Sequence, residues 1–117
     1  MLLDKNGKLV KSLDFRGTKI ELLNKITAPD LFKIITSAQQ LVNMRESFKA
    51  RDLEPKELNK TVYQPILDAC EGDKKEAYRL FGVVIKQALI MTPLLFSQAG
   101  SGNDYEGVTY TREYLEF

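Results

Sequence analysis

Acidic side chains supply the residue pairs in this sequence whose spacing best suits acid–base chemistry. Three pairs share a separation of three residues: Asp68 with Glu71, Asp73 with Glu76, and Glu54 with Glu57. On a helix this spacing places both carboxylates on one side of a turn, where they could act as general acid and base. Each pair also lies beside an expected helix end, where capping and the helix dipole favour acidic residues. We therefore interpret the pairs as helix-terminal residues, and predict no catalytic residues and no enzymatic activity.

The sequence has no histidine and one cysteine, Cys70. Histidine is the commonest general base, and zinc sites are built mainly from histidine and several cysteines. The segment 4–8, Asp-Lys-Asn-Gly-Lys, is too short and too basic for a calcium-binding loop. The glycines at 100, 102 and 107 fit neither the Walker nor the dinucleotide-binding spacing, and the acidic residues among them would repel phosphate. We predict no metal, no cofactor and no small-molecule substrate.

Length and charge indicate one domain whose N-terminal half is basic and whose C-terminal half is acidic. The chain has 117 residues, of which 44% are hydrophobic, and this is enough for a single core over residues 1–117. The formal net charge is only +1, which argues against a polybasic nucleic-acid coat. Residues 1–51 carry ten basic and five acidic groups, whereas residues 52–117 carry seven and eleven. This polarity suits head-to-tail self-association, or separate faces for an acidic and a basic partner.

The first 26 residues are predicted to form a β-meander. Short alternating runs favour strands over residues 1–3, 8–15 and 18–23, with a tight turn at Asn6-Gly7. The expected inner-face residues are Leu9, Leu13, Phe15, Ile20 and Leu22. Residues 20–26 are also compatible with the beginning of a helix.

A helical core is predicted over residues 27–96. Thr27, Pro29 and Asp30 are typical of a helix start, and apolar residues recur at helical spacing from there to about residue 51. A second helix is expected between 52 and 72, kinked or divided at Pro65. A third should begin at Asp73 and bend or end at Pro93, with residues 94–96 as one further turn.

The remaining residues are predicted to form a loop followed by a strand or tail. Residues 97–107 are rich in glycine and polar residues, which favours a flexible loop, and residues 108–117 begin with strict alternation of β-formers. The expected fold is therefore α+β and mostly helical. It has three principal helices, kinked by proline, with a small antiparallel sheet formed by the N-terminal meander and, as an open alternative, the C-terminal strand.

The C-terminal aromatic residues are the first candidates for partner binding. Tyr105, Tyr110, Tyr114 and Phe117 lie among acidic residues within thirteen positions. Tyrosine side chains carry much of the energy of many interfaces, and an extended segment can add a strand to a partner sheet. The alternative is that Tyr110 and Tyr114 complete the sheet of this domain itself.

Basic residues of the meander are the candidates for a nucleic-acid interface: Lys5, Lys8, Lys11, Arg16 and Lys19. On one face they could bind phosphates. Interleaved acidic residues and the lack of a nucleic-acid-binding motif argue against this, and lysines also protect sheet edges from aggregation.

These observations favour a non-enzymatic protein-interaction or self-assembly module. Assembly factors, adaptors and inhibitors are often small chains of this kind, including some that phages encode. A nucleic-acid-binding accessory protein is the alternative. The chain begins without a leader-like apolar run, and its most apolar stretch, residues 80–96, is short and contains Lys86. We expect a cytoplasmic protein without membrane contact that binds a protein partner or forms a homo-oligomer.

Overall fold

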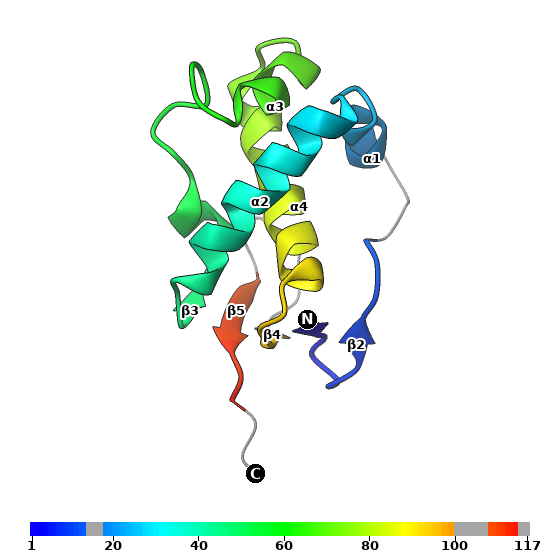
Figure 1. Cartoon of the computed structure of the whole chain (residues 1–117), viewed down its shortest axis with the longest axis vertical. Helices are drawn as coiled ribbons and strands as arrows, with labels where there is room; N and C mark the ends of the chain where they lie inside the picture. The colour runs from blue at the N-terminus through cyan, green and yellow to red at the C-terminus, as the bar shows by residue number, and fades with distance from the viewer. Residues whose placement is uncertain (14–17, 100–107, 115–117) are drawn as a thin grey trace.

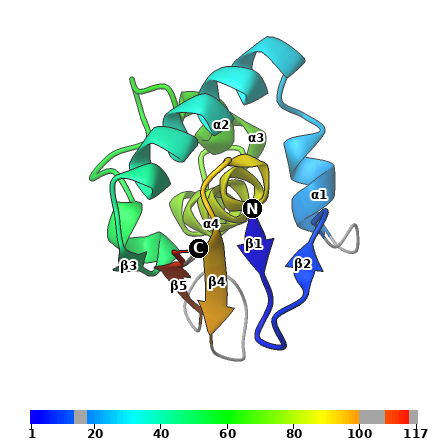
Figure 2. The same ribbon diagram turned by 60° about the horizontal axis from the view of Figure 1, so that its bottom comes forward.

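The chain adopts an α+β fold in which helices are grouped on one side of a sheet (Figures 1 and 2). The structure is a computed structural model that describes residues 1–13, 18–99 and 108–114. The helices of this part are α1 (Thr18–Leu23), α2 (Ala28–Asn43), the 3-10 helix η1 (Ala50–Leu53), α3 (Gln64–Ala69) and α4 (Lys74–Met91). None of these helices is long and apolar enough to span a lipid bilayer.

Five short strands form one mixed sheet at the end of the molecule where the chain begins (Figure 1). They are β1 (Leu2–Leu3), β2 (Leu9–Val10), β3 (Ser47–Phe48), β4 (Phe96–Ala99) and β5 (Thr109–Arg112). Their spatial order is β2-β1-β4-β5-β3. The prediction of a purely antiparallel sheet is wrong, because β1 lies parallel to β4 while the other neighbours are antiparallel. The C-terminal strand is confirmed over Thr109–Arg112, but it pairs with β4 and β3 and not with the N-terminal hairpin.

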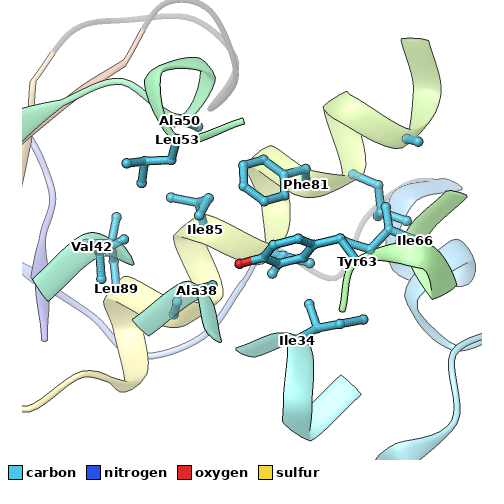
Figure 3. Close-up of a cluster of buried hydrophobic side chains, with 14 of the residues drawn as sticks. Ile34, Ala38, Val42, Ala50, Leu53, Tyr63, Ile66, Phe81, Ile85 and Leu89 are labelled. Carbon is cyan, nitrogen blue, oxygen red and sulfur yellow. The ribbon is translucent and has the colours of Figure 1, made fainter. Parts of the chain in front are cut away.

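Helix α4 is the centre of the core. It packs along α2, and Figure 3 shows Ile85 and Leu89 of α4 close to Ala38 and Val42 of α2. Tyr63 and Phe81 meet edge to face, with ring centroids 5.2 Å apart. Most apolar residues of α4 are buried, which agrees with its apolar character on more than one side.

The starts of the two long helices are confirmed. Thr27 caps α2 by accepting a hydrogen bond from the backbone nitrogen of Asp30 at 3.4 Å. Asp73 caps α4 in the same way and accepts from the backbone nitrogen of Glu76 at 3.2 Å. Such caps satisfy amide groups that the helix itself leaves without partners.

The predicted strand at 18–23 is wrong, because these residues form helix α1. Leu22 and Leu23 pack from this helix against the core, and the following turn buries Ile26. A six-residue segment can have apolar residues at both strand and helix spacing, so its sequence fits a strand or a helix. Contact with α3 and α4 favours the helix. The expected strand over 8–15 is shorter, since β2 covers only Leu9–Val10 and residues 14–17 lie outside the described residues.

The first two predicted helices of the core are too long. Helix α2 ends at Asn43, and Phe48, expected in the same helix, lies in β3, where it pairs with Tyr110. The second region is helical only over Gln64–Ala69, so Pro65 lies in the first turn of α3 and does not kink a longer helix. Residues 54–63 run as turns, held by Tyr78, whose hydroxyl donates to the carbonyl oxygens of Pro55 and Lys56 at 3.1 Å.

The region after α4 also differs from prediction. The helix ends at Met91, before Pro93 as expected, but no helical turn follows over 94–96. Phe96 begins β4 instead, so Ser97, Gln98 and Ala99 are strand residues and not part of a loop. Residues 100–107, the rest of the predicted loop, lie outside the described residues.

Candidate interaction surface

The two faces of the sheet differ in their side chains. Adjacent strand residues point to opposite faces, and cross-strand partners share a face. Phe48, Phe96 and Tyr110 lie on the inner face. The Phe48 ring contacts both of the others, with its centroid 6.0 Å from that of Phe96 and 5.7 Å from that of Tyr110. They belong to the core cluster together with the helices.

One residue from every strand forms a row across the outer face: Leu9, Leu3, Ser97, Thr111 and Ser47, from one edge to the other. The two leucines lie on the β2–β1 side, and the three hydroxyl residues lie on the β4–β5–β3 side. The Ser47 and Thr111 hydroxyl oxygens are 3.4 Å apart, and the Ser97 hydroxyl donates to the carbonyl oxygen of Thr111 at 3.4 Å. No helix formed by the described residues packs on this face.

A second row follows when each register is continued by one residue: Lys11, Met1, Leu95 and Glu113. Backbone hydrogen bonds support the alignment of Met1, Leu95 and Glu113, whereas Lys11 is placed by extending the β1–β2 register. The Phe96 nitrogen donates to the Met1 carbonyl oxygen at 2.9 Å, and the Glu113 nitrogen donates to the Leu95 carbonyl oxygen at 2.8 Å.

The two rows create an apolar patch, which we call the outer apolar patch: Met1, Leu3, Leu9 and Leu95. Met1 is 41% exposed and Leu9 is 50% exposed. Leu3 and Leu95 are half-buried. None of the four belongs to the core cluster or to the partly buried residues packed against it. Oppositely charged residues flank the patch, with the exposed Lys11 on the β2 side and Glu113 on the β5 side. Glu113 accepts a hydrogen bond from the Ser97 hydroxyl at 2.6 Å through one carboxylate oxygen.

The predicted C-terminal binding residues are divided by the fold. Tyr110 is fully buried in the core, so its ring serves the sheet of this domain. Tyr114 is 63% exposed, and its hydroxyl donates to Glu46 Oε1 at 2.5 Å while the Arg112 guanidinium lies 5.1 Å from its ring centroid. The hydrogen bond to Glu46 raises the pKa of Tyr114. Tyr105 and Phe117 lie outside the described residues.

The predicted basic residues are only partly brought together. Lys5, Lys8 and Lys11 are exposed on the β1–β2 hairpin, whereas Lys19 is half-buried on α1. Arg16 lies outside the described residues. In the hairpin turn the Asp4 carboxylate accepts hydrogen bonds from the Asn6 and Lys8 backbone nitrogens at 2.8 and 2.9 Å. The bond from Lys8 is the main cause that lowers the pKa of Asp4.

Three residues of the acidic pairs have structural partners. Asp73 caps α4, Glu76 forms an ion pair with Arg79 at 2.9 Å, and Asp68 accepts a hydrogen bond from the Gln64 amide at 2.9 Å. Within residues 1–13, 18–99 and 108–114, no group of three or more acidic or cysteine residues is arranged to hold a metal ion. For Asp73 and Glu76, at the start of α4, these contacts agree with the interpretation as helix-terminal residues. Glu54 and Glu57 lie outside the described α-helices, and Glu54 Oε1 is buried without a hydrogen-bond partner among the described residues.

The lone cysteine lines a hollow between α1, α3 and the start of α4. The hollow has a volume of about 220 Å³, and Glu71, Asp73 and Glu76 also line it. Cys70 is 7% exposed, and burial raises the pKa of its thiol, with a further contribution from Glu76 and Asp73. A thiol held in its neutral form is a weak nucleophile.

Sequence reasoning missed the outer apolar patch. It assigned Leu9 to the inner face, but Val10 pairs with Leu2 on the inner face and Leu9 pairs with Leu3 on the outer face. The useful signal was the pair of adjacent apolar residues at Leu2-Leu3 and at Leu9-Val10. Alternation alone requires one residue of each pair to face away from the core.

Comparisons with known proteins identify no relative. No protein-family model, curated protein or solved structure matches this chain. The function must therefore be argued from the surface itself.

Proposed function

We propose that this chain is a non-enzymatic protein-interaction module that acts by binding another protein or a copy of itself. The observation that carries the proposal is the outer apolar patch, whose four apolar side chains have no role in the core. Apolar groups gathered on a surface beside hydroxyl and charged groups are typical of protein interfaces. Met1 and Leu9 are the most exposed members of the patch, and removing either side chain from water would contribute favourably to the free energy of binding.

Tyr114 adds a second supporting feature. Its ring is held against Arg112, the strand partner of Phe96, while most of it stays exposed next to the sheet. A tyrosine that is already positioned loses little conformational entropy on binding and can serve as an anchor. Tyr105 and Phe117 remain predicted contacts of the same segment.

Site-specific crosslinking tests this function. A photoreactive amino acid at position 9 should form covalent adducts, with a partner protein or between copies, when the protein is irradiated in cell extract. The matched control places the same group at position 32, because Phe32 is 73% exposed on α2 and remote from the sheet. Adducts of equal yield from both positions, or from neither, would refute the outer face as a binding surface.

Nucleic-acid binding is the second candidate, and the three exposed lysines of the β1–β2 hairpin favour it. Binding of labelled DNA or RNA should weaken steeply between about 50 and 200 mM salt if these lysines bind phosphates. Lys5→Glu with Lys8→Glu should abolish it, whereas Lys74→Glu with Lys75→Glu, two exposed lysines of α4, should not. The absence of any binding at low salt would eliminate this candidate.

A cytoplasmic location is part of the same proposal. It is supported by the unpaired, buried thiol of Cys70, since free buried cysteines are common in proteins of reducing compartments. Cell fractionation with a tagged chain tests it.

A further inference from the structure

We propose that the outer face of the sheet docks on the same face of a second copy of this chain, in a dimer with twofold symmetry. The inference rests on the proposed function and names the partner. It follows from the order of residues across the outer face together with the symmetry rule for identical subunits.

Identical subunits in a dimer use the same patch, so each residue on one side of the axis meets a different residue from the partner copy. The second row of the outer face contains Lys11, Met1, Leu95 and Glu113, on β2, β1, β4 and β5 in that order. A twofold axis parallel to the strands, between β1 and β4, reverses this order in the second copy.

This axis gives a complementary arrangement. Lys11 of each copy then faces Glu113 of the other, so two ion pairs form at the rim. Between them, Met1 of each copy faces Leu95 of the other. In the first row, which has one residue from every strand, Leu9 of each copy faces Thr111 of the other and Leu3 faces Ser97. Packed sheets lie about 10 Å apart, a separation at which such side chains interdigitate.

Charge selects this axis over the perpendicular one. An axis perpendicular to the strands that passes through the row of Lys11 and Glu113 would bring Lys11 against Lys11 of the second copy and Glu113 against Glu113. A perpendicular axis between the two rows would place Lys11 against Leu9 and Glu113 against Thr111, so that neither charge would face one of opposite sign. Like charges brought together in an interface are unfavourable and exclude wrong arrangements. Glu113 is also well placed, because its contact with Ser97 uses only one carboxylate oxygen and fixes the side chain on the outer face.

Sedimentation velocity over a range of protein concentrations tests the dimer with the full chain. The native protein should change from monomer to dimer as concentration rises, and Leu9→Glu should weaken the dimer at least tenfold, because it places a charge on the β2 side of the contact, where the second copy would otherwise cover an apolar side chain. Phe32→Glu is the matched control and should leave the dimer unchanged. Leu9 and Phe32 are both exposed, so both variants should keep the native helical circular dichroism.

Charge reversal identifies the pairing itself. Lys11→Glu and Glu113→Lys should each weaken the dimer, and the two changes in one chain should restore it, because both ion pairs are then re-formed with reversed sign. A chain that stays monomeric at every concentration overturns the inference. So does a dimer that neither Leu9→Glu nor the single reversals weaken.

These outcomes are separable from failure of the proposed function. A monomeric chain whose position 9 crosslinks to a different protein would refute the dimer while supporting the interaction module. A monomeric chain with no specific adduct at position 9 would refute both.

Discussion

The inner and outer faces of the sheet are built from neighbouring residues of the same strands, yet they have different physical roles. In β4, Phe96 is fully buried and its ring lies against that of Phe48, whereas the next residue, Ser97, is half-buried and bonds to Thr111 and Glu113. In β1, Leu2 is fully buried, and Leu3 lies on the outer apolar patch. The inner face is therefore part of the core that stabilises the fold, whereas the residues of the outer apolar patch are not part of that core.

The largest effect should come from Phe96→Ala, which leaves a cavity among Phe48 and the neighbouring core residues. The expected loss in the free energy of unfolding is about 3–5 kcal/mol, measured by urea denaturation. Ser97→Ala is the matched control on the opposite face and should cost less than about 1 kcal/mol, since its hydrogen bonds lie near solvent. Equal losses from the two substitutions would break the distinction between the faces.

The adjacent leucines of β1 repeat the comparison with the same residue type. Leu2→Ala should cost about 2–5 kcal/mol, because Leu2 is fully buried. Leu3→Ala should cost less than about 1 kcal/mol in the monomer, because Leu3 has no place in the core cluster. Thermal unfolding at low protein concentration measures both. A large loss for Leu3→Ala would show that the outer leucines serve the fold.

The two faces also mark the limit of prediction from the sequence. Helices α2 and α4 could be predicted where they begin, because long apolar periodicity and a capping residue indicate the same element. The strands β1, β2 and β3 contain two residues each, too few for any periodicity to appear. Their place in the sheet depends on partners far along the chain, such as Phe48 with Tyr110.

The face on which each strand residue lies was equally hard to predict. Leu9 and Val10 are both apolar, so their sequence does not show which of them faces the core. Pairing with β1 decides it, because Leu2 is buried and brings Val10 to the inner face. The candidate binding surface thus depends on tertiary register. The sequence does identify Tyr110 and Tyr114 as candidates either for partner binding or for completing the sheet. It does not show which of the two is buried.

Removal of the N-cap of α4 should change the free energy of unfolding by an amount between those expected for the inner and outer faces of the sheet. Asp73→Ala should lower the free energy of unfolding by about 1 kcal/mol, because the backbone nitrogen of Glu76 loses its acceptor. Asp73→Asn, which keeps an oxygen acceptor, should recover most of this loss. Urea denaturation gives both values. No difference between the alanine and asparagine variants would contradict the capping role.

The smallest effect on stability is expected at Tyr114, on the exposed end of the C-terminal segment, where a titration is more informative than unfolding. The Tyr114 hydroxyl donates to the Glu46 carboxylate, and this bond favours the protonated tyrosine, so its pKa is raised. Glu46→Ala should therefore lower the pKa of Tyr114 toward the ordinary tyrosine value of about 10, with no measurable change in the free energy of unfolding. NMR titration of assigned tyrosine ring carbons checks this, with Tyr78 as internal control, because burial raises the pKa of Tyr78 independently of Glu46. An unchanged Tyr114 titration in Glu46→Ala would mean that the tail is not held at Glu46, and Tyr114 would then lack the fixed position that suits it to anchor a partner.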